Sequence, residues 1–188
     1  MLDAALARRI KLVALDVDGV LTDGGIYLGM VAHQSLEFKR FHVQDGLAVK
    51  LLRAAGLSVL LVSGRASEAT EARAQEMEVD ELLQVAPREK LAALVKALEC
   101  RGIQLEECVY VGDDLADLPV LRAVGLGISV PNAAAEVRAA AAMVTSVPGG
   151  EGAVRQVAEM LLKARGEWPA ILARYTADDV ADPRHGSR

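Results

Sequence analysis

The sequence is poor in cysteine: its 188 residues contain only Cys100 and Cys108. So few thiols exclude the disulfide framework of a small secreted domain. No group of cysteine and histidine residues has the spacing of a structural zinc site. The spacing permits a disulfide between the two cysteines, but two reduced, half-buried thiols are the expected state.

Clustered positive charge and long apolar stretches are also missing. No run of Lys or Arg is longer than Arg8-Arg9, and the net charge is −5, which argues against a nucleic-acid surface. A phosphorylated substrate would need local cations, because the overall field repels anions. No stretch has the length of a membrane helix or the pattern of a signal peptide. We therefore expect a cytoplasmic protein that binds neither nucleic acid nor membrane.

The composition is that of an ordinary globular domain, with 52% apolar and 25% charged residues. Short apolar runs alternate with longer helical patterns, as in βαβ units. Strands are predicted over residues 11–16, 57–63, 108–113, 126–130 and 143–147. Helices are predicted over residues 45–55, 67–77, 88–100, 114–123, 133–141 and 151–165. This order predicts one α/β domain with a mainly parallel sheet.

Two segments depart from this alternation. Residues 24–44 alternate like two β-strands around a Gly-Met-Val-Ala turn at 29–32, which predicts an antiparallel hairpin inserted where a helix is due. After Gly166 the periodicity is lost. We therefore assign residues 1–166 to a single domain and residues 167–188 to a C-terminal tail.

Polar side chains gather where three of the predicted strands end. These are Asp16 and Asp18 after the first strand, Ser63, Gly64 and Arg65 after the second, and Asp113, Asp114 and Asp117 after the third. Lys90 opens the helix that precedes the third strand. Because ligands of an open parallel sheet bind outside the carboxyl ends of its strands, we expect these groups to converge on one site.

Crowded carboxylates with no histidine or cysteine nearby favour Mg²⁺ as the partner. We predict Asp16, Asp113 and the backbone carbonyl of Asp18 as its ligands. Asp16 would then attack a phosphoryl group and form an aspartyl-phosphate. Asp18, two residues on, would protonate the leaving oxygen and later deprotonate the attacking water.

The remaining polar groups suit phosphate binding. Ser63, with Gly64 and Arg65, lies at a strand-to-helix turn whose free N–H groups favour an anion. Lys90 would stabilise the transferring group. Asp117 is expected to orient Lys90 or water, with Asp114 beside it. Thr22 is expected to border the substrate and, with Asp23, to support the Asp16 loop.

Each motif alone has a simpler explanation. Asp or Asn near glycine is usually turn chemistry, Gly-Asp-Asp is a common helix N-cap, and an isolated lysine such as Lys90 is usually solvated. The order of the motifs and their placement at strand ends together favour a phosphoryl-transfer site.

The phrases DVDGVLTDG, LLVSGR and VGDDLADLPVL, together with Lys90, resemble the four motifs of the haloacid dehalogenase superfamily. The phrases FKRFHVQDG, VGLGISVPNA and GGEGAVRQV look like its capless 3-deoxy-D-manno-octulosonate 8-phosphate phosphatases. The resemblance covers about residues 11–163. It implies a Rossmann-like three-layer sandwich without a cap domain, Mg²⁺ as cofactor, and a homotetramer in which hairpins pack together. It also implies Asp16 as nucleophile, Asp18 as acid/base, Ser63 and Lys90 on phosphate and Asp113 on metal.

Four positions differ from the pattern of that family. Gln44 and Glu151 stand where many relatives have Arg, Ala66 where Lys is frequent, and Val85 where Gly is usual. Arg65, Lys39 and Arg40 are left as cations for a sugar carboxylate. Glu151 resembles the related nonulosonate 9-phosphate phosphatases. We therefore place the octulosonate phosphate first and a nine-carbon sugar-acid phosphate second.

Two rival classes share some of these features. Receiver domains of signalling proteins also phosphorylate an aspartate on a doubly wound sheet, but their phosphorylated residue ends a middle strand, whereas Asp16 ends the first. A non-catalytic relative serving only for oligomerisation should have lost a nucleophile, acid or metal ligand, and all are present here. A phosphotransferase or mutase could use the same intermediate, although a mutase would usually need a cap to exclude water.

Overall fold

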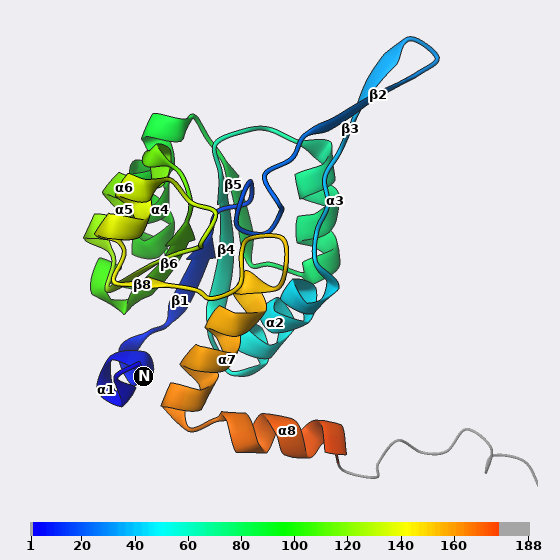
Figure 1. Ribbon diagram of the computed structural model, residues 1–188. Helices are drawn as coiled ribbons and strands as arrows, with labels where there is room; N and C mark the ends of the chain where they lie inside the picture. The colour runs from blue at the N-terminus through cyan, green and yellow to red at the C-terminus, as the bar shows by residue number, and fades with distance from the viewer. Residues whose placement is uncertain (1, 177–188) are drawn as a thin grey trace, which may run out of the picture.

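The computed structural model describes residues 2–176, in which six parallel strands form a sheet with helices on both sides (Figure 1). The strand order is β5-β4-β1-β6-β7-β8. The bounds are β1 Leu12–Leu15, β4 Ser58–Ser63, β5 Glu81–Gln84, β6 Cys108–Gly112, β7 Leu126–Ser129 and β8 Met143–Val144. This arrangement confirms the predicted Rossmann-like α/β fold.

Strands β1 and β6 are buried along their whole length, which is why they appear in the sequence as continuous apolar runs. The helices are α1 Ala4–Arg9, α2 Val43–Ala54, α3 Glu68–Met77, α4 Lys90–Glu99, α5 Leu118–Ala123, α6 Ala135–Ala140, α7 Ala153–Arg165 and α8 Trp168–Thr176. Helices α2, α3 and α7 lie on one side of the sheet, and α4, α5 and α6 on the other (Figure 1). The crossovers change side at β1, so a crevice opens at the carboxyl end of this strand.

The hairpin consists of β2 Tyr27–Val31 and β3 Gln34–Phe38, and it projects away from the sheet (Figure 1). The predicted position of its turn, at residues 29–32, was wrong. The turn lies at Ala32 and His33, which both adopt positive φ angles of 46° and 66°. Gly29 instead pairs with Leu36 inside the ladder. The primed turn that hairpin twist favours is thus formed here without glycine, so the usual signal is missing.

Other elements differ from the prediction in physically informative ways. Strand β5 and helix α1 were not predicted, and the last predicted strand is only two residues long. The tail prediction was wrong for residues 168–176, which form α8. There Ile171 is buried, and the Trp168 ring lies under Arg155 and Lys163 at 5.6 and 5.1 Å. The rest of the predicted tail lies outside the described residues.

Within residues 2–176, no helix is both long and apolar enough to cross a membrane. Both cysteines are free, with Cys108 buried in β6 and Cys100 exposed. Burial raises the pKa of the Cys108 thiol to about 12, so this thiol is unreactive at neutral pH.

Candidate active site

Three strand ends line one cleft of about 340 Å³ at the crevice beside β1. Its lining comes from the loops after β1, β4 and β6 and from the start of α4, and comprises Asp16, Asp18, Gly24, Gly64, Arg65, Pro87, Lys90, Asp113, Asp114 and Ala116. The fold therefore brings most of the predicted site residues together. Ser63, Thr22 and Asp117 are buried behind this surface.

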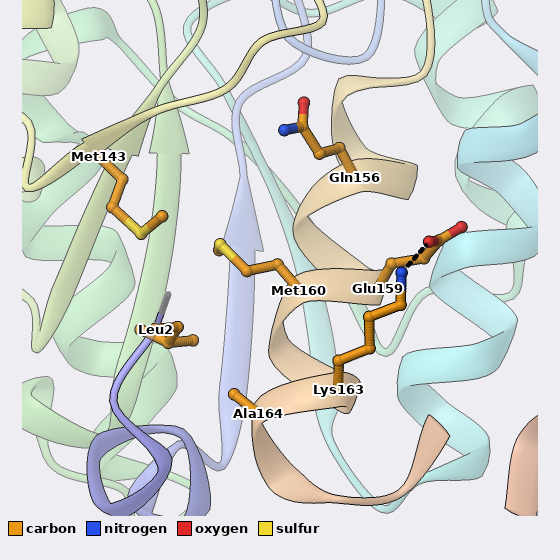
Figure 2. A pocket seen from close by; sticks show the side chains of 7 residues that line it. All are labelled: Leu2, Met143, Gln156, Glu159, Met160, Lys163 and Ala164. Atoms are coloured by element: carbon orange, nitrogen blue, oxygen red, sulfur yellow. Dashed lines mark hydrogen bonds and ion pairs between the residues drawn. The ribbon is translucent and has the colours of Figure 1, made fainter. Parts of the chain in front are cut away.

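A second hollow, of about 410 Å³, lies between α7 and β8 (Figure 2). Its walls are mainly apolar, with Met143 and Met160 facing each other across it. The charged groups at its rim, Glu159 and Lys163, already pair with each other at 2.7 Å. This hollow has no convergent polar groups and is not a candidate for the chemistry.

Asp16 follows β1 directly and is 4% exposed. Its Oδ1 lies 2.9 Å from Lys90 Nζ. Burial and the Asp117 charge raise the pKa of Asp16 well above its usual value, against the attraction of Lys90. Burial alone would lower the pKa of Lys90, but Asp16 and Asp117 raise it. The ammonium group stays charged, and this one cation is shared between the carboxylates of Asp16 and Asp117.

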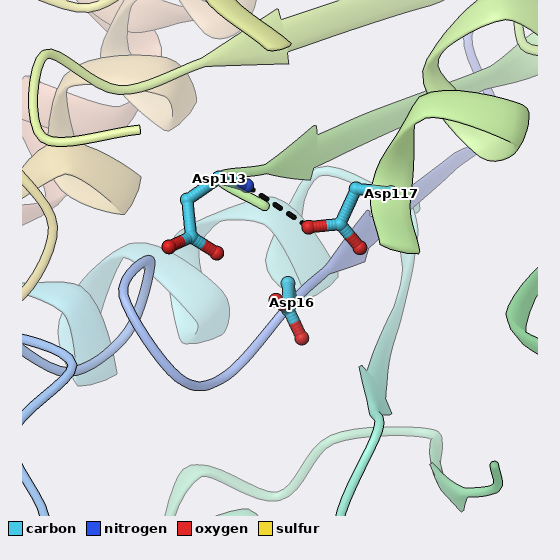
Figure 3. A group of neighbouring side chains, drawn as sticks. All are labelled: Asp16, Asp113 and Asp117. Carbon is cyan, nitrogen blue, oxygen red and sulfur yellow. Dashed lines mark hydrogen bonds between the residues drawn. The ribbon is translucent and has the colours of Figure 1, made fainter. Parts of the chain in front are cut away.

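Asp117 holds this arrangement together from a fully buried position (Figure 3). Its Oδ1 accepts hydrogen bonds from Lys90 Nζ at 2.8 Å and Tyr110 Oη at 2.6 Å. Its Oδ2 accepts from the backbone N–H groups of Asp113 at 3.0 Å and Asp114 at 3.1 Å. The contact with Lys90 agrees with the expectation that Asp117 orients this lysine. With four donors bound, Asp117 is better suited to organise the site than to ligate a metal.

Asp113, unlike Asp117, has a carboxylate oxygen that no donor contacts. Its Oδ1 is buried without a hydrogen-bond partner, and burial together with the Asp117 charge raises its pKa to about 6. Carboxylate oxygens of Asp16, Asp113 and Asp117 lie within 4.8 Å of one another. A partnerless buried oxygen beside excess negative charge fits a hard divalent cation such as Mg²⁺. Since both oxygens of Asp117 already accept two hydrogen bonds each, Asp16 and Asp113 are the side chains left to hold this ion.

The absence of a side chain at Gly19 leaves space for the Asp113 carboxylate. A Cβ at Gly19 would lie 2.0 Å from Asp113 Oδ2, and the φ angle of +89° also requires glycine. Thr22 fixes the same loop, because its Oγ1 accepts hydrogen bonds from Gly19 N at 3.2 Å and Gly24 N at 3.1 Å. Thr22 is fully buried. Its place supports the loop and is not on the substrate side, which corrects that part of the prediction.

Ser63 ends β4 with its hydroxyl turned into its own loop. The Oγ donates to Arg65 O at 3.0 Å and accepts from Arg65 N at 3.2 Å. The side chain is fully buried, so contact with phosphate would require this hydroxyl to rotate. Asp114 is exposed and accepts from Leu115 N at 2.8 Å, as an N-cap does.

The cations expected to hold a sugar carboxylate are placed differently from one another. Arg65 lines the cleft with its side chain 43% exposed, paired to Glu37 at 2.7 Å. Arg40 is paired with Glu151 at 2.7 Å. The Lys39 side chain is wholly buried and contacts Asp18 Oδ1 at 2.7 Å, so the expectation that it meets the substrate was wrong.

Some residues of the site region were not identified as functional from the sequence: Tyr110, which donates to Asp117, and Asn132, Gly149 and Gly150 beside the Asp16 loop. Asn132 donates to Gly19 O at 2.9 Å and accepts from Gly149 N at 2.8 Å, and Gly150 N donates to Val20 O at 3.1 Å. A Cβ at Gly149 would lie 1.8 Å from Gly19 O. The loop before α7 thus packs directly on the loop that carries Asp16 and Asp18. The glycine pair at 149–150 was the only sequence signal for this contact.

Comparisons with known proteins show which proteins this chain resembles. The family model of haloacid dehalogenase-like hydrolases matches residues 83–156. The 3-deoxy-D-manno-octulosonate 8-phosphate phosphatase of Escherichia coli K12 is 39% identical over 163 residues, covering 87% of this chain and 85% of the relative.

Solved structures of the same kind also superpose on this chain. The Moraxella catarrhalis phosphatase of that name, crystallised with magnesium, phosphate and KDO, has a TM-score of 0.87 at 41% identity and covers 92% of this chain and 97% of its own. The Yersinia pestis phosphatase has a TM-score of 0.83 at 36% identity, with 88% of each chain covered.

Proposed function

Because the chain belongs to the 3-deoxy-D-manno-octulosonate 8-phosphate phosphatases, within the haloacid dehalogenase-like hydrolases, we propose that it releases phosphate from this sugar acid through phosphorylated Asp16. It is a phosphoric monoester hydrolase, and its cofactor is Mg²⁺. The observation that carries the mechanism is the 2.9 Å contact of Asp16 with Lys90 at the cleft, with Asp18 lining the same cleft.

The chemistry assigns one task to each residue. The Asp16 carboxylate attacks phosphorus as the bond from phosphorus to the sugar oxygen breaks, and Asp18 gives that oxygen its proton. Asp18 then takes a proton from water, which attacks the phosphorus on Asp16 and releases inorganic phosphate. Lys90 stabilises the transferring group. Asp16, Asp113 and the backbone carbonyl of Asp18 would hold Mg²⁺, which would offset the charge on phosphate and carboxylate.

An acid-quench experiment tests the covalent step. Enzyme in excess over substrate is quenched at early times and digested, and the peptide that contains Asp16 is weighed. We expect a phosphoryl adduct on this peptide that decays as inorganic phosphate forms. Stoichiometric adduct on a different residue would contradict the assignment.

The choice of sugar is the finer part of the proposal. Arg65 is the half-exposed cation of the cleft, while Glu151 neutralises Arg40 nearby. We expect kcat/KM to be higher for the octulosonate 8-phosphate than for nonulosonate 9-phosphates. The reverse order would favour the nine-carbon alternative suggested by Glu151.

A homotetramer is also proposed, on the evidence of the hairpin. A two-stranded ribbon is marginally stable alone in water, yet this one exposes large apolar side chains, namely Tyr27, Leu28, Met30, Val31 and Phe38, each at least half exposed. Light scattering should report four chains for the wild type and fewer for a Leu28→Ser, Met30→Ser variant. A monomeric wild type would contradict the proposal. The cytoplasmic location stays a prediction.

A further inference from the structure

Lys39 carries a wholly buried ammonium group at the base of the hairpin, one residue after β3. Its Nζ lies 2.7 Å from Asp18 Oδ1 and 3.8 Å from Glu37 Oε1, and it donates to Thr70 Oγ1 at 3.1 Å. A buried charge is tolerated only where other groups pair with it and satisfy its hydrogen bonds. Here one hydrogen bond, to Thr70, and ion-pair contacts with Asp18 and Glu37 surround one ammonium group.

The partners of Lys39 are themselves anchored. Glu37 accepts hydrogen bonds from Ser67 Oγ and from Arg65, both at 2.7 Å. Thr70 is fully buried in the first turns of α3. The ammonium group is thus attached to the rigid body of the domain, although it comes from the projecting hairpin.

Asp18 has no comparable support of its own. Its side chain is 27% exposed on a loop, and within residues 2–176 Lys39 is its one ion-pair partner. A carboxylate on a loop can rotate away from the cleft, whereas proton transfer needs it within hydrogen-bond reach of the leaving oxygen.

We propose that Lys39 is a positioning residue that holds Asp18 Oδ1 and leaves its second oxygen to face the sugar oxygen during proton transfer. The inference rests on the proposed function. Lys39 acts through Asp18 and does not touch the substrate. The base of the hairpin then positions the general acid, in addition to any contribution of the hairpin to oligomer assembly.

Leaving-group dependence tests this proposal. An alkoxide leaving group needs a proton from Asp18, whereas p-nitrophenolate leaves without one. General acid catalysis contributes about 10²–10⁴-fold, so partial misplacement of Asp18 in Lys39→Met should lower kcat/KM for the octulosonate 8-phosphate by about 10–100-fold. For p-nitrophenyl phosphate the loss should stay within about threefold, because phosphoryl transfer to Asp16 is intact. An equal loss for both substrates would show a merely structural role and overturn the proposal.

Two controls make the result specific. Lys11→Met removes a more exposed lysine–carboxylate pair, 2.8 Å long, at the opposite end of β1, and should change neither substrate's kcat/KM. In an Asp18→Asn background, Lys39→Met should cause no further change in the ratio of the two kcat/KM values, whereas additive losses would refute action through Asp18.

Failure of the proposed function itself would look different. A wild type that hydrolyses neither substrate would refute the phosphatase mechanism. An active wild type whose ratio of the two kcat/KM values is unchanged in Lys39→Met would refute only this inference. If Lys39→Met does not fold, Lys39→Gln provides the same comparison with a polar side chain. The same shift in ratio is expected there, and an unchanged ratio would overturn the proposal.

Discussion

The contrast between Asp113 and Asp117 gives the sharpest prediction. Both carboxylates belong to the acidic cluster beside Asp16, but only Asp113 has a buried oxygen without a hydrogen-bond partner. Asp117 accepts four hydrogen bonds, two of them from Lys90 and Tyr110. In Asp117→Asn the amide keeps one acceptor oxygen, so one pair of donors faces an NH₂ group. Breaking such a buried ion pair typically costs about 3–5 kcal/mol. We expect that loss in urea unfolding with chelator present.

Asp113→Asn should behave in the opposite way. The pKa of Asp113 is raised to about 6 from an ordinary 3.8, so its ionisation at neutral pH opposes folding. Because this carboxyl is partly exposed, we expect the variant to be about 1–3 kcal/mol more stable than wild type in chelator. Added Mg²⁺ at about 100 times its Kd should stabilise the wild type by roughly 2.7 kcal/mol and leave Asp113→Asn unchanged.

Tyr110→Phe is the matched control for Asp117. It removes one hydrogen bond from Oδ1 and leaves Lys90 in place, so a smaller loss of about 1.5–3 kcal/mol is expected, because this hydrogen bond is to a charged acceptor. The reasoning would be refuted if Asp117→Asn were as stable as wild type in chelator but had lost its response to Mg²⁺. That result would make Asp117 a metal ligand and not the organiser of the site.

Two further predictions concern residues away from the reacting atoms. Burial raises the pKa of Asp45 to about 6, so the native state binds more protons than the unfolded state between about pH 4 and 6. The wild type should therefore lose up to about 3 kcal/mol of stability relative to Asp45→Asn as pH rises through this window, and parallel pH profiles would count against it. Gly149→Ala should push the Gly19 carbonyl and depress activity at least tenfold, whereas Gly56→Ala, with no atom within 4 Å, should cost about 1 kcal/mol of stability and keep activity. Equal activities would contradict the packing argument.

The core of the fold and the acidic centre of the site could be predicted from the sequence, because both depend on short-range patterns. Buried parallel strands such as β1 and β6 are continuous apolar runs, and Asp16 and Asp113 come directly after them. Strand β5 was missed because it lies at the sheet edge, is half-buried along its length and begins with Glu81. Its pattern is therefore not that of a buried strand.

Contacts between distant segments could not be predicted in the same way. Asn132 reaches Gly19 across 113 positions, and the sequence gives no pairing information for such a contact. Lys39 was expected among the cations for the sugar carboxylate because it is one of the few cations left where the chain departs from the family pattern. Only the folded chain shows that it is buried against Asp18.

The central claim, that Asp16 is the nucleophile of a Mg²⁺-dependent phosphatase, is tested most directly by phosphate release from 3-deoxy-D-manno-octulosonate 8-phosphate. Wild type and Asp16→Asn are measured side by side with Mg²⁺ and with chelator, after both are shown to be folded. We predict turnover only for the wild type with Mg²⁺. Substantial turnover by folded Asp16→Asn, or full wild-type activity in chelator, would contradict the account.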